Sequence, residues 1–147
     1  MTYKNILLPT DGSENAGRAI RHGIALARAL GASVTGFHAA PPVTPVEYRG
    51  ILPKLVDMNE RKAKIDQQTA RHLKVVEDAA RRAGVRCRVY STTNDFAADA
   101  IVAAAKRYRC DLIFIATHGR RSRRGVLLGS NTQKVLNASP VPVLLDR

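Results

Sequence analysis

The sequence contains no tryptophan, and aromatic residues of all kinds make up only 5% of the chain. A platform on which nucleic-acid bases stack needs exposed aromatic rings, so this class of binding surface is not expected. Cysteine is also scarce: Cys87 and Cys110 occur singly and form no C-x-x-C pair. A disulfide scaffold is therefore excluded, and we expect two structural thiols in a reducing, cytoplasmic compartment.

No run of apolar residues approaches the ~20 residues that a membrane-spanning helix needs, and the beginning of the chain has no signal-peptide pattern. Histidine, cysteine and carboxylate residues are not grouped at the spacing of metal ligands, so no metal site built by the protein alone is expected. His118 has no carboxylate nearby in the sequence to orient it as a general base. We therefore expect neither membrane contact nor catalytic residues.

Acidic residues are few relative to basic ones: 12 aspartates and glutamates against 24 lysines and arginines give a formal net charge of +12. Such an excess is compatible with a nucleic-acid partner. The basic residues, however, are spread along the chain and fall mainly on the polar faces of helix-like segments, which is typical of solvated surface. Nucleic-acid binding is thus the least favoured of the possible functions.

Strand-like and helix-like segments alternate along the chain and predict one α/β domain over residues 1–147. A long basic helix is expected over 59–83, and Asn94 or Asp95 is expected to cap the helix after the third strand. His22 and His72 are expected on helix surfaces. The strands are predicted at residues 5–9, 33–38, 85–90, 112–116 and 141–145.

This alternation predicts a doubly wound, Rossmann-like fold in which helices cover both faces of a five-stranded parallel sheet. If the second and third strands extend one way from the first, and the fourth and fifth the other way, the strand order is 3-2-1-4-5. Ligands bind such sheets outside the carboxyl ends of the strands, where the order reverses. The predicted crevice therefore lies between the exits of the first and fourth strands, Pro9-Thr10-Asp11 and Thr117-His118-Gly119.

The fourth predicted strand leads into a segment rich in glycine and arginine, Ala116 to Thr132. Glycine lets backbone N–H groups approach an anion closely, and the helix expected to begin near Ser130 leaves its first N–H groups unpaired. The chain has neither G-x-x-x-x-G-K-[ST] nor G-x-G-x-x-G after the first strand, so a Walker-type kinase or a Rossmann dehydrogenase is not expected. The segment is predicted to bind phosphate groups in another way.

Three separated motifs resemble those of the universal stress protein family. Nucleotide-binding members of that family carry G-x-x-G, nine residues, and G-[ST] between the fourth strand and the last helix. Here Gly119 matches the second glycine, residues 120–128 are the nine that intervene, Gly129-Ser130 completes the pattern, and Ala116 stands at the first glycine. The opening N-I-L-L-P-T-D-G-S and the closing S-P-V-P-V-L-L also resemble the family, so the resemblance covers the whole chain.

The resemblance implies an adenine-nucleotide site at the predicted crevice. Asp11 would contact ribose or a nucleotide-bound Mg²⁺, backbone near Ala39 would contact adenine, and Gly129 with Ser130 would hold phosphates. Asp11 and Ser130 each have the alternative role of a helix cap. The full set of nucleotide-binding residues predicted in this way is Pro9, Thr10, Asp11, Ala39, Ala116, His118, Gly119, Arg120, Arg121, Gly129, Ser130, Asn131 and Thr132.

The implied function is a regulatory protein of the stress response that binds ATP, ADP or AMP and hydrolyses ATP slowly or not at all. The alternative is a nucleotide-free, chaperone-like stress protein that binds an unidentified protein partner. Similar family members form homodimers through the last strand, so the same pairing is expected at Val141–Leu145. The proline-rich stretch 40–57 is expected to be a connector, either a plain surface loop or a lid over the site.

Overall fold

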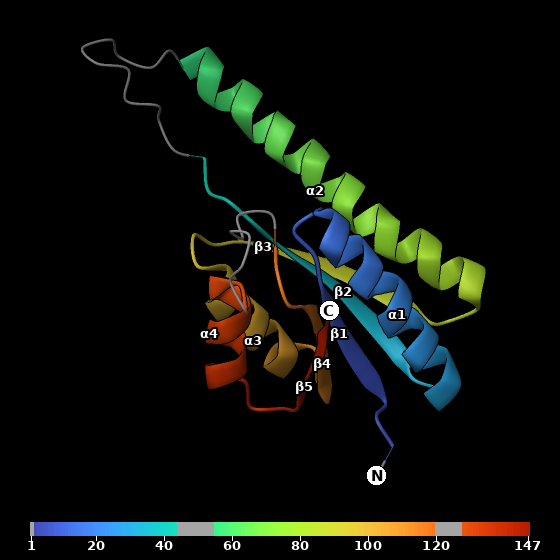
Figure 1. The fold of residues 1–147 in the computed structure, drawn as a ribbon. Helices are drawn as coiled ribbons and strands as arrows, with labels where there is room; N and C mark the ends of the chain where they lie inside the picture. Colours follow the sequence, from blue (N-terminus) through green and yellow to red (C-terminus); the bar gives the residue numbers. More distant parts are fainter. Residues whose placement is uncertain (1, 44–54, 120–127) are drawn as a thin grey trace.

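The computed structural model of the protein describes residues 2–43, 55–119 and 128–147 (Figure 1). Strands and helices alternate through these residues, as the sequence predicts. The elements are β1 (Asn5–Pro9), α1 (Glu14–Leu30), β2 (Ser33–Ala40), α2 (Leu55–Ala83), β3 (Cys87–Thr93), α3 (Ala97–Arg107), β4 (Leu112–Ala116), α4 (Ser130–Ala138) and β5 (Val143–Asp146).

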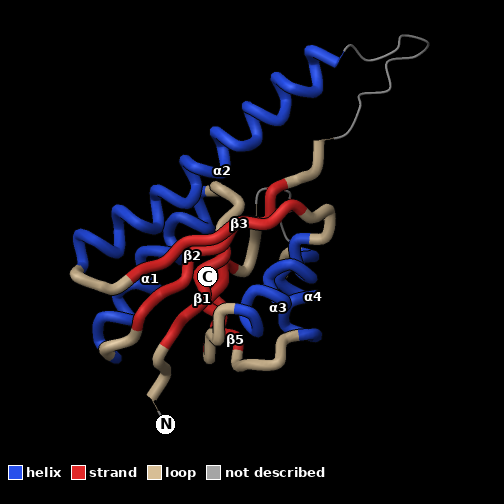
Figure 2. Tube along the Cα trace, turned by 180° about the vertical axis from the view of Figure 1, so that it is seen from behind, coloured by secondary structure: helices blue, strands red, loops and turns tan. Residues whose placement is uncertain are grey.

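The described strands form a 5-stranded parallel sheet in the order β3-β2-β1-β4-β5, which confirms the predicted fold class. Helices α1 and α2 cover one face of the sheet and α3 and α4 the other (Figures 1 and 2). The amino-terminal part of α2 projects beyond the sheet (Figure 1). Among the described residues, no helix combines the length and the apolar composition needed to cross a membrane.

Alternate side chains of each central strand enter two separate cores. Ile6 and Leu8 of β1 pack with α1 and α2, whereas Leu7 between them packs with α3 and α4. In β4, Phe114 belongs to the first core and Ile113 to the second. Because both faces of the sheet are covered, these strands are apolar throughout instead of alternating with polar residues.

Two glycines let the helices on one face lie close to the sheet. A Cβ at Gly23 of α1 would lie 2.5 Å from Leu8 Cδ2, and a Cβ at Gly36 of β2 would lie 2.9 Å from Val76 Cγ1 of α2. Larger residues at these positions would push α1 and α2 outward. The absence of a side chain at Gly23 and Gly36 thus helps to set the distance between these helices and the sheet.

The predicted boundaries of several elements need correction. The third strand, β3, covers Cys87–Thr93 instead of 85–90, and α2 begins at Leu55 instead of 59. The last strand begins at Val143, not Val141, and extends to Asp146, which pairs with Ala116. Pro142 has no N–H to offer a sheet, although its carbonyl accepts a hydrogen bond from Ile113 N. The predicted cap of α3 is also wrong: the helix begins after Phe96, and the Asn94 side chain accepts a bond from Phe96 N at 2.8 Å in the preceding turn.

Candidate functional site

A cavity of about 410 Å³ opens at the carboxyl ends of β1 and β4, and we call it the switch-point cavity. β1 pairs with both β2 and β4, so the cavity lies where the strand order reverses, as predicted. Its volume suits a small organic ligand. The predicted site residues among its lining are Pro9, Thr10, Asp11, Ala39, Ala116, His118, Gly119, Gly129, Ser130, Asn131 and Thr132.

The remaining predicted site residues, Arg120 and Arg121, lie outside the described residues. So do residues 44–54 of the proline-rich stretch expected to be a plain surface loop or a lid. The fold therefore brings together every predicted site residue that it describes. That these residues bind a nucleotide stays a prediction.

The exit of β1 forms a tight turn held by its own side chains. Thr10 N donates to Phe37 O of β2, and Gly12 N donates to Thr10 Oγ1. Asp11 Oδ1 accepts from Ser13 N at 2.9 Å, while Ser13 Oγ accepts from Ala16 N and caps α1. Ser13 is thus the cap of α1, and the Asp11 carboxylate is anchored at the mouth of the cavity by the turn.

The exit of β4 is joined directly to the start of α4. Gly129 N donates to Thr117 O at 2.7 Å, and the buried Thr132 Oγ1 donates to Ala116 O at 2.9 Å. A Cβ at Gly129 would lie 3.3 Å from Thr117 O and 3.5 Å from His118 Cα. These contacts place the amino terminus of α4 against the backbone that leaves β4.

Helix α4 begins without a side-chain cap, because its N-cap residue is Gly129. The N–H groups of its first turn are the partial positive end of the helix dipole. Ser130 and Asn131, the first two residues of the helix, are exposed and line the cavity. The arrangement is suited to binding an anionic group.

A carboxylate from β1 lies beside this terminus. Asp11 Oδ2 is 2.6 Å from the position that a Cβ would take at Gly119, so the exits of β1 and β4 meet across the switch point. A carboxylate there repels a bare phosphate but can bind sugar hydroxyls or a divalent cation. The cavity therefore combines an anion-binding end with a neighbouring acceptor for hydroxyl groups or Mg²⁺.

Two histidines in the cavity were not predicted as site residues. His38 is buried, and its Nδ1 lies 2.8 Å from Thr10 O. Its ring meets the ring of His72 edge to face, with centroids 4.9 Å apart. The expectation that His72 is a surface residue is wrong, because α2 turns this half-buried side chain inward over Gly12.

Gly12 explains why the ring of His72 fits there. This glycine has φ +77°, and a Cβ on it would overlap the His72 ring. His22, by contrast, is exposed as expected and contacts Asp146 Oδ1 through Nδ1 at 2.7 Å. Within the described residues, no group of histidine, cysteine and carboxylate side chains is arranged to hold a metal ion.

The sheet order, the cavity at its switch point and the glycine-capped α4 place the chain among the doubly wound α/β proteins with a cleft for a small ligand. The model of the universal stress protein family matches residues 2–147. The chain therefore belongs to the universal stress protein family.

Two relatives show the extent of this similarity. A universal stress protein of Thermus aquaticus, from the region 3′ of a QAH/OAS sulfhydrylase, is 35% identical over 145 residues, which cover 99% of each chain. The solved structure of MJ0577, a universal stress protein of Methanocaldococcus jannaschii, superposes with a TM-score of 0.81 at 26% identity, covering 99% of this chain and 96% of that one.

Solved structures of more distant family members contain adenine nucleotides. A universal stress protein in complex with cAMP has a TM-score of 0.70 at 24% identity, covering 100% of this chain and 98% of the other. Complexes with dAMP from Archaeoglobus fulgidus and with AMP from Arabidopsis thaliana have TM-scores of 0.64 and 0.67. At these identities the likeness to this chain is one of fold.

Proposed function

We propose that this protein binds an adenine nucleotide, ATP, ADP or AMP, in the switch-point cavity and acts as a nucleotide-responsive regulatory protein of the stress response. The observation that carries the proposal is the meeting of Asp11 with Gly119 beside the uncapped start of α4. The nucleotide complexes of the distant family members support it.

In the proposed pose the phosphates lie at Gly129 and Ser130. The first-turn N–H groups of α4 and the exposed Ser130 hydroxyl are the donors there. A hydrogen bond to a charged group contributes about 1.5–3 kcal/mol, so a few such bonds give useful affinity. Gly129 itself has no side chain between this turn and the β4 exit, which lets the start of α4 lie directly against that backbone.

The sugar and base extend from there toward β1 and β2. Asp11 is placed to accept hydrogen bonds from ribose hydroxyls or to coordinate a nucleotide-bound Mg²⁺. Ala39, Ile101 and Ile115 line the part of the cavity beside β2 and α3 and offer apolar contact to a planar base. The backbone near Ala39 would read the edge of adenine.

We further propose that a second copy of the chain pairs with β5. In the described sheet β5 has β4 on one side and lies at the edge. Leu144 of this strand is 39% exposed, so this edge of the sheet offers an apolar side chain to a second strand. Leu144→Lys is expected to convert a dimer to a monomer in sedimentation velocity, and a wild-type protein that sediments as a monomer would contradict this pairing.

The nucleotide proposal is tested by calorimetry on protein that has been stripped of nucleotide by denaturation and refolding. Mg-ATP is expected to bind in the micromolar range, and Asp11→Asn and Gly129→Val are expected to weaken binding at least about tenfold. Asp66→Asn is the matched control for the carboxylate change, because Asp66 is an exposed residue of α2 whose side chain forms an ion pair with Lys62, one helical turn away.

The absence of heat for ATP, ADP and AMP, together with no shift in thermal unfolding, would contradict the proposal. The same result would favour the nucleotide-free, partner-binding alternative.

A further inference from the structure

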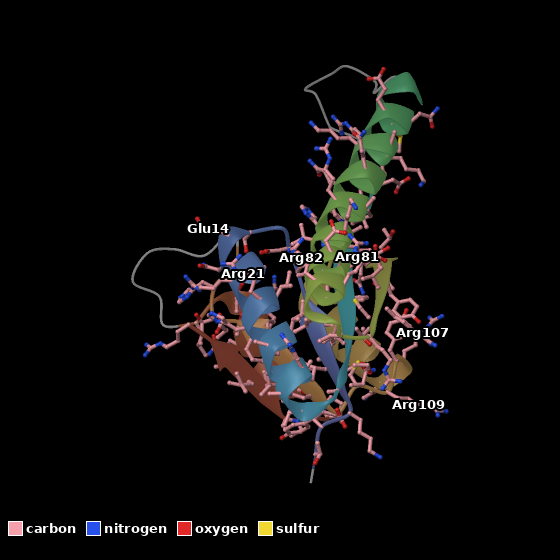
Figure 3. The ribbon with its side chains drawn as sticks, turned by 90° about the vertical axis from the view of Figure 1, so that its right-hand side faces the viewer. Glu14, Arg21, Arg81, Arg82, Arg107 and Arg109 are labelled. Carbon is pink, nitrogen blue, oxygen red and sulfur yellow. The ribbon has the colours of Figure 1, made fainter. Side chains whose placement is uncertain are left out.

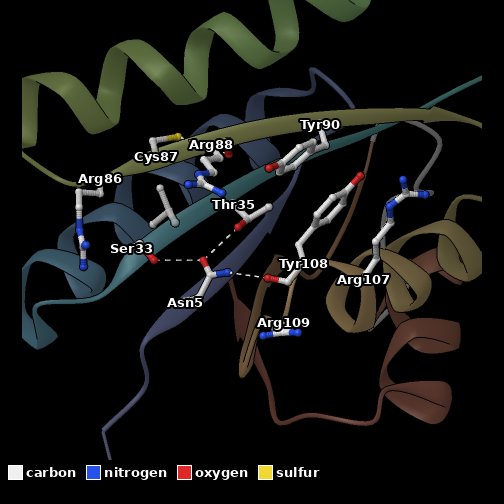
Figure 4. Close-up of a pocket in the computed structure, with 11 residues that line it drawn as sticks. Asn5, Ser33, Thr35, Arg86, Cys87, Arg88, Tyr90, Arg107, Tyr108 and Arg109 are labelled. Atoms are coloured by element: carbon white, nitrogen blue, oxygen red, sulfur yellow. Dashed lines mark hydrogen bonds between the residues drawn. The ribbon is translucent and has the colours of Figure 1, made fainter.

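A second cavity, also of about 410 Å³, lies at the opposite end of the sheet from the switch point. It is formed where β1, β2 and β3 begin and where α3 ends (Figure 4). We call it the arginine pocket, because Arg86, Arg88, Arg107 and Arg109 all line it. The proposed nucleotide function does not involve it.

The face of the sheet inside this pocket is polar where a doubly wound sheet is ordinarily apolar. Leu7 of β1 and Phe37 of β2 belong to the core between the sheet and α3. On the same face, two residues earlier in each strand, stand Asn5 and Thr35. In β3 the corresponding face carries Arg88 beside Tyr90, so polar residues replace the expected apolar run on three neighbouring strands.

The floor and one wall of the pocket are held in place by internal contacts. Asn5 Nδ2 donates to Tyr108 O at 3.1 Å, and Asn5 Oδ1 accepts from Thr35 Oγ1 at 3.0 Å (Figure 4). The rings of Tyr90 and Tyr108 stack with centroids 3.8 Å apart and an interplanar angle of 7°. These residues therefore form a preorganised polar surface.

The positive charge of the arginines around this surface is not neutralised by ion pairs. None of the ion pairs found among the described residues involves an arginine of the pocket. The neighbouring carboxylate of Asp111 instead accepts from the backbone N–H groups of Lys4 and Asn5. Positive charge is thus concentrated around a cavity whose described lining contains hydrogen-bond donors and no acidic side chain.

The backbone at Arg109 gives independent evidence that this side chain has a role. Helices α1, α2 and α3 end in the same Schellman-type pattern, in which two N–H groups after the helix turn back to carbonyls of its last turn. The left-handed position is Gly31 at φ +68° in α1 and Gly84 at φ +70° in α2. In α3 it is Arg109 at φ +54°, although a side chain there costs conformational free energy. A residue kept in an unfavourable conformation points to a function of its side chain.

We infer that the arginine pocket binds a compact, phosphate-bearing polyanion. Guanidinium groups donate paired hydrogen bonds that match phosphate oxygens, and four of them, all from exposed residues, stand around one cavity here (Figure 4). The stacked tyrosines and the Asn5 network fix the shape of the surface that such a ligand would meet. A role of Arg86 and Arg88 limited to protecting the edge of β3 from aggregation would explain neither the presence of Arg109 in the pocket nor its backbone conformation.

The inference is tested by titrating ¹⁵N-labelled protein with inorganic tripolyphosphate at low salt and following the backbone amide signals. Amides of residues 33–35, 86–90 and 107–110 are expected to shift. Any binding at the switch-point cavity is recognised separately, because it shifts amides of 10–12, 117–119 and 129–132. Citrate in a parallel titration distinguishes a preference for phosphate from binding of any polyanion, and equal affinity for citrate would overturn the phosphate assignment.

Two variants and one control locate the interaction. Arg88→Gln and Arg109→Asn are each expected to weaken binding at the pocket amides about tenfold. Arg21→Gln removes the same charge from α1, away from Arg107 and Arg109 (Figure 3), and is expected to change the affinity by less than about twofold. Asparagine tolerates the left-handed conformation, so Arg109→Asn should also raise the unfolding temperature, a result that misfolding would not produce.

The inference is overturned if the pocket amides do not shift. It is equally overturned if Arg21→Gln weakens binding as much as Arg88→Gln does, since binding would then follow net charge alone.

Discussion

The Asp11 carboxylate occupies the space that a side chain at Gly119 would need, with Oδ2 2.6 Å from the ideal Cβ position. The two residues come from the exits of β1 and β4 and are 108 positions apart in the sequence. This proximity brings the glycine of the proposed phosphate-binding motif next to the carboxylate proposed to bind ribose or Mg²⁺. A methyl group added at Gly119 would displace this carboxylate, which also accepts a hydrogen bond from Ser13 N.

Gly119→Ala is accordingly expected to impair nucleotide binding more than folding. The added Cβ displaces the Asp11 carboxylate from its proposed ligand, so affinity for Mg-ATP should fall about tenfold or more by calorimetry. The free energy of unfolding in urea should fall by only about 1 kcal/mol, because the clash is with the end of one side chain and its main cost is the hydrogen bond from Ser13 N. Unchanged affinity for Mg-ATP would show that the carboxylate does not contact the ligand.

Gly12→Ala is expected to destabilise the protein by about 2–4 kcal/mol, measured by urea unfolding. One part of this loss is conformational, because Gly12 has φ +77°. The other part is steric, since the new Cβ would overlap the ring of His72.

A double-mutant cycle separates the two parts of the Gly12 effect. In a His72→Ala background only the conformational part remains, so Gly12→Ala should then cost about 1–2 kcal/mol. An equal loss in both backgrounds would mean that the His72 ring moves freely, contrary to its edge-to-face contact with His38.

The fold and the position of the switch-point cavity could be predicted because they depend on local patterns. Apolar runs separated by helical periodicity specify a parallel sheet, and right-handed crossovers restrict its strand order. Once β1 and β4 are neighbours, the exits that carry Asp11 and Gly119 meet at the switch point. Chain order alone therefore brings these motifs together.

The contacts that could not be predicted depend on the rotation and register of single elements. The inward turn of His72 follows from how α2 lies on the sheet, and no local pattern in a long basic helix specifies that angle. The left-handed conformation of Arg109 could not be predicted either. The positions after α1 and α2 that adopt this conformation are glycines, Gly31 and Gly84, whereas an arginine gives no such signal in the sequence. The arginine pocket is open to solvent because β3 lies at the edge of the sheet.

Two glycines in α1 are expected to respond to alanine in opposite directions. Gly17→Ala should raise the free energy of unfolding by about 0.5–1 kcal/mol, because alanine favours the helix and the new Cβ has only Arg21 Nη1 near it, at 3.9 Å. Gly23→Ala should lower it by about 1 kcal/mol overall, because overpacking outweighs the same helix propensity. There the Cβ would lie 2.5 Å from Leu8 Cδ2 and 3.3 Å from the ring of Phe114.

Urea unfolding of the two α1 variants side by side is the measurement. A gain in both variants would mean that α1 can move outward from β1 and β4, and that Gly23 does not set its distance from the sheet.

Both cysteines are expected to make the folded protein less stable at alkaline pH. Burial raises the pKa of the Cys87 thiol from 9.0 to about 11, with a further contribution from the charge of Glu77. Burial likewise raises the pKa of Cys110 to about 11, opposed by a hydrogen bond from Thr35 and assisted by the charge of Asp111. In the unfolded chain each thiol keeps its ordinary pKa of 9.0, so between these pH values only the unfolded state loses the thiol protons.

The unfolded chain then binds fewer protons than the folded protein, and the free energy of unfolding must fall as pH rises from about 9 to about 11. The thiol contribution is fully present below about pH 9. Urea unfolding at about pH 8 and about pH 10, with a reducing agent present, should show a larger drop for the wild type than for Cys87→Ala/Cys110→Ala. Comparing the decrease in the free energy of unfolding between the two pH values, instead of its absolute value, removes any pH-independent effect of the substitutions on packing. Equal drops would mean that both thiols ionise as readily in the folded protein as in the unfolded chain, which the burial of Cys110 against Asn5 and the core opposes.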